Sequence, residues 1–187
     1  LQAWLGWRAW RLSAHSLLLI LYFLFPVTIF EWERPLAGWL TVSWPLALIG
    51  HYWILRPYDE WNTRFIAFLH LGAYWLISLL ITIQTLWWLE SNMIYGLWVQ
   101  LSFALVPAVL MALIYEGRAI WPWPIRVHPH WYLHIAQIPI VTFLVFWFWG
   151  MNLNEDGNIR EWRYWVLLNP MDITMGLLML LWWRLLR

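Results

Sequence analysis

The feature that decides how this chain can fold is a series of apolar runs, most of them about as long as a membrane-spanning helix. The runs cover residues 12–30, 36–55, 62–89, 93–115, 131–149 and 171–186. A backbone exposed to lipid must satisfy its own hydrogen bonds, and these runs lack the polar and apolar alternation of barrel strands. Hydrophobic residues make up 63% of the chain and charged residues 11%, which is too apolar for a soluble core of this length. The sequence therefore predicts one all-α domain over residues 1–187, a polytopic transmembrane helical bundle of six spans embedded in the lipid bilayer.

The arginines divide unequally between the two sides of such a bundle and predict its orientation. The side with both termini holds Arg8, Arg11, Arg56, Arg64, Arg118, Arg126, Arg184 and Arg187, whereas the other side holds Arg34, Arg160 and Arg163. The positive-inside rule then places both termini in the cytoplasm of a bacterial inner membrane, and the loop over residues 150–170 on the periplasmic or external side. Tryptophans gather near the ends of the runs, as expected at membrane interfaces, and residues 1–11 are predicted to form an interfacial entry helix.

Polar residues on two of the runs predict contacts inside the bundle. His70, Tyr74 and Ser78 lie on one face of the third run at 100° per residue, and His134 and Gln137 share a face of the fifth run. Hydrogen bonds between helices are the common use of such residues in a bilayer. The alternative is a polar path between the third and fifth helices.

Three histidines near the start of the fifth run have a spacing compatible with metal ligation. These are His128, His130 and His134, and a neutral imidazole is the commonest nitrogen ligand. The chain has no cysteine, and the sequence places no carboxylate beside the three imidazoles. No cofactor is therefore predicted, and zinc or haem at these histidines is the alternative.

The loop before the last run is acidic, and its carboxylates are the candidate catalytic groups. Glu155, Asp156, Glu161 and Asp172 lie near aromatic residues, where they could bind a sugar or act as general acid and base, although plain solvation gives the same composition. Asn152 and Asn154 at the start of this loop favour local turns.

The residues that open the last run also predict a helix start. Asn169 suits the N-cap, Pro170 the first helical position, and Asp172 the positive end of the helix dipole. The chain has no nucleophile elbow, phosphate-binding glycine-rich loop or HExxH motif, so no enzyme activity is assigned. It has no basic patch with interleaved aromatic residues that projects into water, which argues against a nucleic-acid partner.

Three stretches carry a resemblance to a known family: RPLAGWLTVSWPLALIGHYWILRPYDE, FLHLGAYWLISLL, and NLNEDGNIREWRYWVLLNPMDITMGLLMLLWWRLLR. In this order they resemble a bacterial membrane family catalogued as domain of unknown function 2339, and YWVLLNPMD is the most specific part. Met171 stands where the family usually has leucine. The resemblance implies that the chain is the C-terminal part of a longer membrane protein and packs against further membrane helices. The recurring positions it implies are Pro45, His51, His70, Asp156, Gly157, Asn169, Pro170 and Asp172.

Three functions are compatible with these features. The first is a structural or scaffold module of a larger cell-envelope membrane protein, in which the polar faces bond to one another. The second is a transporter or flippase component with a wet path along the third and fifth helices. The third is a membrane-bound transferase or hydrolase that acts on an envelope glycan or lipid through the acidic loop.

Overall fold

A computed structural model describes residues 17–31, 34–58, 63–92, 96–121, 123–154 and 169–185. Within these ranges the chain forms helices and turns and no strand, which confirms the predicted all-α class. The chain divides into two compact units, Leu1–Gln84 and Thr85–Arg187. The predicted interfacial helix over residues 1–11 and most of the predicted loop over residues 150–170 lie outside the described residues.

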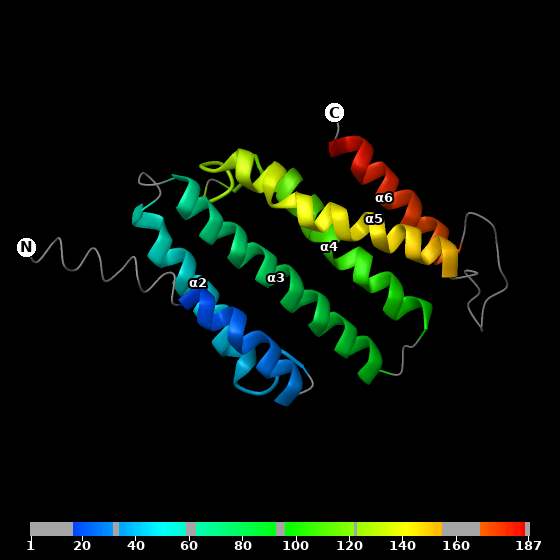
Figure 1. Ribbon diagram of the computed structural model, residues 1–187, viewed down its shortest axis with the longest axis horizontal. Coiled ribbons are helices and arrows are strands. Elements are labelled where there is room, and N and C mark those ends of the chain that lie inside the picture. The colour runs from blue at the N-terminus through cyan, green and yellow to red at the C-terminus, as the bar shows by residue number, and fades with distance from the viewer. Residues whose placement is uncertain are drawn as a thin grey trace, which may run out of the picture. The chain divides into compact units, whose positions relative to one another are not determined.

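The first unit contains an N-terminal helix, Leu17–Glu31, followed by α2 (Leu40–Leu55), the short 3₁₀-helix η1 (Arg56–Tyr58) and α3. Helix α3 covers Thr63–Ser91 and continues past the boundary of this unit (Figure 1). The three long helices share one apolar core, built from Leu18, Leu21, Trp44, Leu48, Leu55, Ile66, Leu69, Ala73, Leu76 and Leu80. Gly38, in the turn before α2, has a φ of 49°, a left-handed conformation that glycine adopts without a steric penalty.

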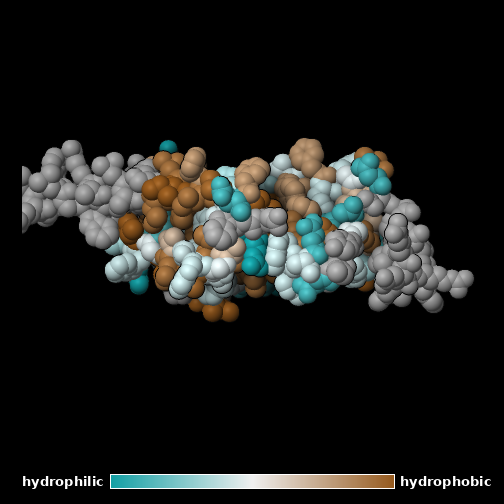
Figure 2. Space-filling model, turned by 90° about the horizontal axis from the view of Figure 1, so that it is seen from below, coloured by the Kyte–Doolittle hydropathy of each residue, from teal (hydrophilic) through white to brown (hydrophobic). Residues whose placement is uncertain are grey.

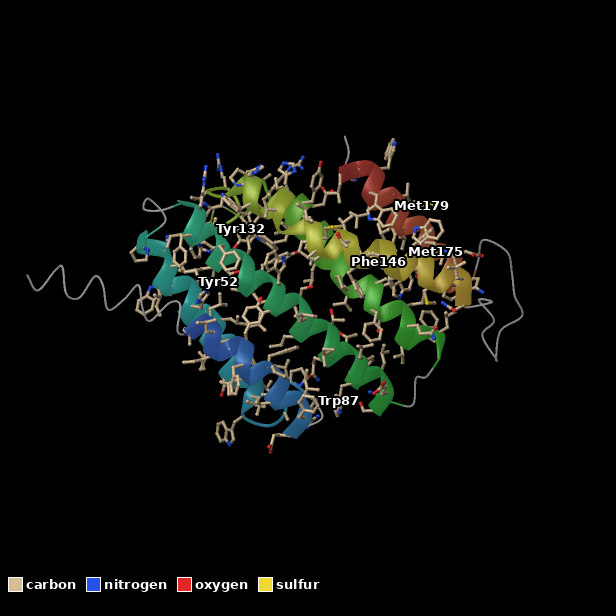
Figure 3. The ribbon with its side chains drawn as sticks, in the orientation of Figure 1. Tyr52, Trp87, Tyr132, Phe146, Met175 and Met179 are labelled. Atoms are coloured by element: carbon tan, nitrogen blue, oxygen red, sulfur yellow. The ribbon has the colours of Figure 1, made fainter. Side chains whose placement is uncertain are left out.

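The second unit contains α4 (Leu97–Gly117), a five-residue π-helix η2 (Trp131–Ile135), α5 (Gln137–Asn154) and α6 (Pro170–Leu185). Helix α4 contacts both α5 and α6. Near one end of α5 these helices enclose a small apolar core of Leu97, Leu101, Met151, Met171 and Met175, of which Met175 is labelled in Figure 3. The fold thus reproduces the predicted runs as helices in the predicted order.

Three of the described helices are long and apolar enough to cross a membrane: Arg64–Ser91, Leu97–Gly117 and Trp131–Asn154. Leu17–Glu31 and Leu40–Leu55 are shorter apolar helices. Large apolar side chains remain at the surface, and hydrophobic residues are plainly visible on the face shown in Figure 2. Examples are Phe30 and Trp39, each 87% exposed, and Phe146, 73% exposed. Lipid is the solvent that tolerates such a surface.

The end of α5 differs from the sequence-based interpretation. The fifth run was predicted to end at residue 149 and to be followed by turns at Asn152 and Asn154, but the helix continues to Asn154. The Asn152 Nδ2 donates to the Phe148 carbonyl at 2.7 Å, and the Asn154 Nδ2 donates to the Gly150 carbonyl at 2.8 Å. Both amides therefore bond to carbonyls one helical turn back, so the turn prediction at these two asparagines is wrong.

Candidate functional site

The N-terminal helix and α3 approach closely at Gly72. The Tyr22 hydroxyl donates a hydrogen bond to the Gly72 carbonyl at 2.6 Å. A Cβ atom on Gly72 would lie 2.8 Å from Leu18 Cδ2 and 3.7 Å from Tyr22 Cε2. The missing side chain therefore lets the two helices meet, which is a common use of small residues in membrane helix packing.

Helix α2 contacts the same stretch of α3 through a cluster of three rings. His51 and His70 are fully buried, and the ring of Tyr52 lies 5.9 Å from that of His51 and 5.4 Å from that of His70 between centroids. Tyr52 is labelled in Figure 3. Its hydroxyl donates a hydrogen bond to the His70 carbonyl at 3.3 Å. His51 Nε2 lies 3.3 Å from the Leu69 carbonyl, and because a carbonyl only accepts, this nitrogen must carry the proton.

The predicted polar stripe on α3 is buried. His70, Tyr74 and Ser78 expose 6% of their surface or less, and the same is true of Thr82 one turn further on. The Thr82 hydroxyl donates to the Ser78 carbonyl at 2.7 Å, within the same helix. The other residues predicted to line the path, His134 and Gln137, belong to the second unit, and the path between the third and fifth helices stays a prediction.

Further along α3, Gln84 fixes the turn that precedes α2. Its Oε1 accepts a hydrogen bond from the Leu36 backbone N–H at 3.0 Å. This N–H lies before the first turn of α2, where no helical carbonyl is available to it. One long side chain from α3 therefore positions a loop 48 residues away in the sequence.

In the second unit, the residues predicted at the start of the fifth run lie on a π-helical turn. The Ala136 N–H donates to the Trp131 carbonyl at 2.7 Å, a bond to the fifth preceding residue. Gln137 is buried, and its Nε2 donates to the Tyr132 carbonyl at 2.6 Å. Tyr132 is labelled on this turn in Figure 3. The Gln137 side chain is thus used to stabilise the irregular turn.

The three predicted metal ligands differ in their surroundings. His128 is 5% exposed, whereas His130 and His134 are exposed, with ring centroids 5.4 Å apart. Among the residues that the structure describes, no three side chains of His, Cys, Asp or Glu gather in a group that could hold a metal ion. His128, the buried histidine, therefore does not complete a three-ligand site with the exposed pair.

The start of α6 has the geometry of a capped helix. Asn169 is buried, and its Oδ1 accepts a hydrogen bond from the Met171 N–H at 2.8 Å. Pro170 is the first helical residue, and Asp172 lies in the first turn. Asp172 is the one candidate catalytic carboxylate within the described residues, since Glu155, Asp156 and Glu161 lie outside them.

A further contact that sequence reasoning missed joins the ends of α4 and α6. Arg184 Nε lies 2.9 Å from Glu116 Oε1, and Arg184 Nη2 donates to Glu116 Oε2 at 3.2 Å. The Tyr115 hydroxyl donates to the Arg184 carbonyl at 3.4 Å, and the Arg118 guanidinium lies 4.0 Å from the centre of the Tyr115 ring. Glu116 and Arg184 are 68 residues apart in the sequence. The one feature of the sequence that could have predicted this ion pair is their opposite charge at the predicted cytoplasmic ends of the fourth and sixth apolar runs.

The described residues form long apolar helices, and polar side chains of one helix bond to backbone carbonyls of another. The protein is therefore an all-helical, multi-pass membrane protein. The chain belongs to the family described as Predicted membrane protein (DUF2339), whose model matches residues 1–187. This match confirms the resemblance seen in the sequence. No curated protein and no solved structure matches the chain significantly.

Proposed function

We propose that the chain is a scaffold module of a larger membrane protein in the bacterial inner membrane. In this proposal the six predicted runs all cross the bilayer, both termini lie in the cytoplasm, and the loop over residues 150–170 faces the periplasm. Its partners are lipid and further membrane helices of the same or another chain. The module contributes a rigid, packed bundle and carries out no chemistry of its own.

The observation that supports a scaffold is a set of hydrogen bonds that side chains of other helices make to backbone carbonyls in one short stretch of α3, residues 69–72. The carbonyls of Leu69, His70 and Gly72 receive side chains from two helices, through His51, Tyr52 and Tyr22 respectively. Each carbonyl lies inside a helix and is already an acceptor in the helical ladder, so it takes the second bond with its remaining lone pair.

Such bonds favour rigid packing over a solvent path. A hydrogen that is already donated to a carbonyl of another helix is not available for a hydrogen bond to a hydrated substrate. A hydrogen bond between membrane helices contributes on average about 0.6 kcal/mol to stability. The α3 polar groups next to this stretch are buried, and Thr82 bonds within its own helix. In a transporter the same residues would line a wet cavity, where they would be exposed for at least part of the cycle.

A cysteine scan of α3 tests the proposal, because the chain contains no cysteine of its own. Tyr74→Cys, Ser78→Cys and Thr82→Cys are placed one at a time in the parent chain in its native membrane and treated with a membrane-impermeant maleimide. Ser91→Cys, at an exposed position at the end of α3, is the matched positive control. A scaffold predicts that the control is labelled and that the three buried positions are protected. Labelling at two successive stripe positions contradicts the scaffold and supports the transporter alternative.

A further inference from the structure

Two exposed imidazoles lie side by side at the start of the fifth run. His130 immediately precedes η2, and His134 lies within it, so the two residues are four apart. Their ring centroids are 5.4 Å apart and their planes are inclined by 46°. Both side chains are exposed, in contrast to the buried His51 and His70 of the first unit.

This separation matches the one that a shared metal ion requires. A nitrogen–metal bond of about 2.1 Å plus about 1.2 Å to the ring centre, opened at a tetrahedral angle of about 109°, gives centroids about 5.4 Å apart. The observed 5.4 Å agrees with this value. Residues four apart on a helix face the same side, which is the arrangement that several helical zinc sites use.

The backbone at this pair is irregular, and specific bonds maintain the irregularity. The π-helical turn is closed by the Ala136 N–H on the Trp131 carbonyl, and the buried Gln137 side chain occupies the Tyr132 carbonyl. Single π-turns within helices are rare and are frequently found at functional sites. The ring of Trp131 lies edge-on to that of His130, at 6.2 Å and 73°, and restricts the orientation of that imidazole.

We propose that His130 and His134 form a two-histidine chelate for a borderline divalent transition-metal ion of the zinc, copper and nickel group. Imidazole suits these ions, whereas calcium and magnesium require oxygen ligands. Because no third His, Asp or Glu joins the pair among the described residues, the other coordination positions are filled by water or by a donor from outside this part of the chain. The site is therefore open and suited to reversible binding.

Metal titration of the full 187-residue chain in lipid nanodiscs tests the site. The protein is purified with a tag that contains no histidine, and Cu²⁺ and Zn²⁺ are titrated separately by isothermal calorimetry, with electron paramagnetic resonance on the Cu²⁺ samples. His130→Ala and His134→Ala each remove one imidazole. A variant that combines His134→Ala with Ile138→His keeps the number of histidines. Ile138 is 58% exposed, so the added imidazole replaces no core side chain. Its two imidazoles are eight residues apart, about 12 Å along the helix, which is too far to share an ion.

The proposal predicts one saturable site per chain in the parent, with nitrogen coupling from two imidazoles in the Cu²⁺ spectrum. Each alanine variant loses at least about tenfold in affinity, and the relocated histidine does not restore it. Circular dichroism of the apo variants controls for folding. The proposal is overturned if the parent has no saturable site, or if folded alanine variants bind with parental affinity. Restoration of affinity by the relocated histidine also overturns it, because binding would then follow histidine number and not this pair.

Discussion

The close approach at Gly72 makes a quantitative prediction, because a second helical glycine provides a matched control. A Cβ atom on Gly72 would lie 2.8 Å from Leu18 Cδ2, about 0.7 Å inside an ordinary carbon–carbon contact of about 3.5 Å. A Cβ atom on Gly50, in α2, would meet nothing within 4 Å. Replacement of a helical glycine by alanine gains up to about 1 kcal/mol, whereas overpacking costs about 1–3 kcal/mol.

We therefore expect the free energy of unfolding to rise by up to about 1 kcal/mol in Gly50→Ala and to stay unchanged or fall by up to about 2 kcal/mol in Gly72→Ala. Valine sharpens the contrast. Gly50→Val stays within about 0.5 kcal/mol of the parent, and Gly72→Val loses about 1–3 kcal/mol or more. Leu18 is 5% exposed, and Leu18→Ala removes the Cδ2 atom that a side chain at position 72 would overlap. The double variant of Leu18→Ala and Gly72→Val therefore loses less free energy of unfolding than the sum of the two single losses.

The assay is reversible unfolding in mixed micelles of increasing SDS content, followed by circular dichroism at the helical bands. The difference between the two valine variants is the informative quantity, because both substitutions change the same residue type inside a helix. Equal stability of Gly50→Val and Gly72→Val, or strict additivity of Leu18→Ala with Gly72→Val, would refute the close helix contact.

Three further predictions use the same unfolding assay. Asn169→Ala removes the acceptor of the Met171 N–H and is expected to cost about 1 kcal/mol, whereas Asn169→Asp retains the cap and most of the stability. In a double-mutant cycle, Glu116→Gln and Arg184→Met show a coupling energy of about 0.2–1 kcal/mol. This coupling weakens in high salt, because both side chains are more than half exposed, and a coupling unaffected by salt would contradict the expectation. Gln84→Leu leaves a backbone N–H without its acceptor and costs about 1–3 kcal/mol, whereas Gln84→Glu keeps an acceptor and costs less; equal losses would exclude the bond.

The helices were predictable because their signal is local. Each apolar run appears as a helix, since a backbone in lipid has few alternatives. The start of α6 was also predictable, because it depends on local features. Asn169 accepts a hydrogen bond from the N–H of Met171, two residues away, and Pro170 is the first residue of the helix. The end of α5 was misjudged because asparagine is ambiguous: Asn152 favours turns in water, yet here its amide bonds to the carbonyl one turn back.

Contacts between helices were less predictable. The polar stripe on α3 indicated burial, but the sequence did not show that Tyr22 and Tyr52 would bond to carbonyls of α3, because such partners depend on how helices are rotated against one another. Gly72 in an apolar run was a signal that could have located the first contact. The π-turn left no clear pattern, since it depends on the bond between Gln137 and a backbone carbonyl.

The orientation of the loop over residues 150–170 tests the central claim most directly. Single cysteines at Gly157, in this loop, and at Ala119, at an exposed position after α4, are each introduced into the cysteine-free chain and treated with an impermeant maleimide in cells with a permeabilised outer membrane. The account predicts labelling of the first variant in cells with an intact inner membrane and labelling of the second only after lysis. The opposite pattern, or equal labelling of both before lysis, would contradict a six-span bundle with its termini in the cytoplasm.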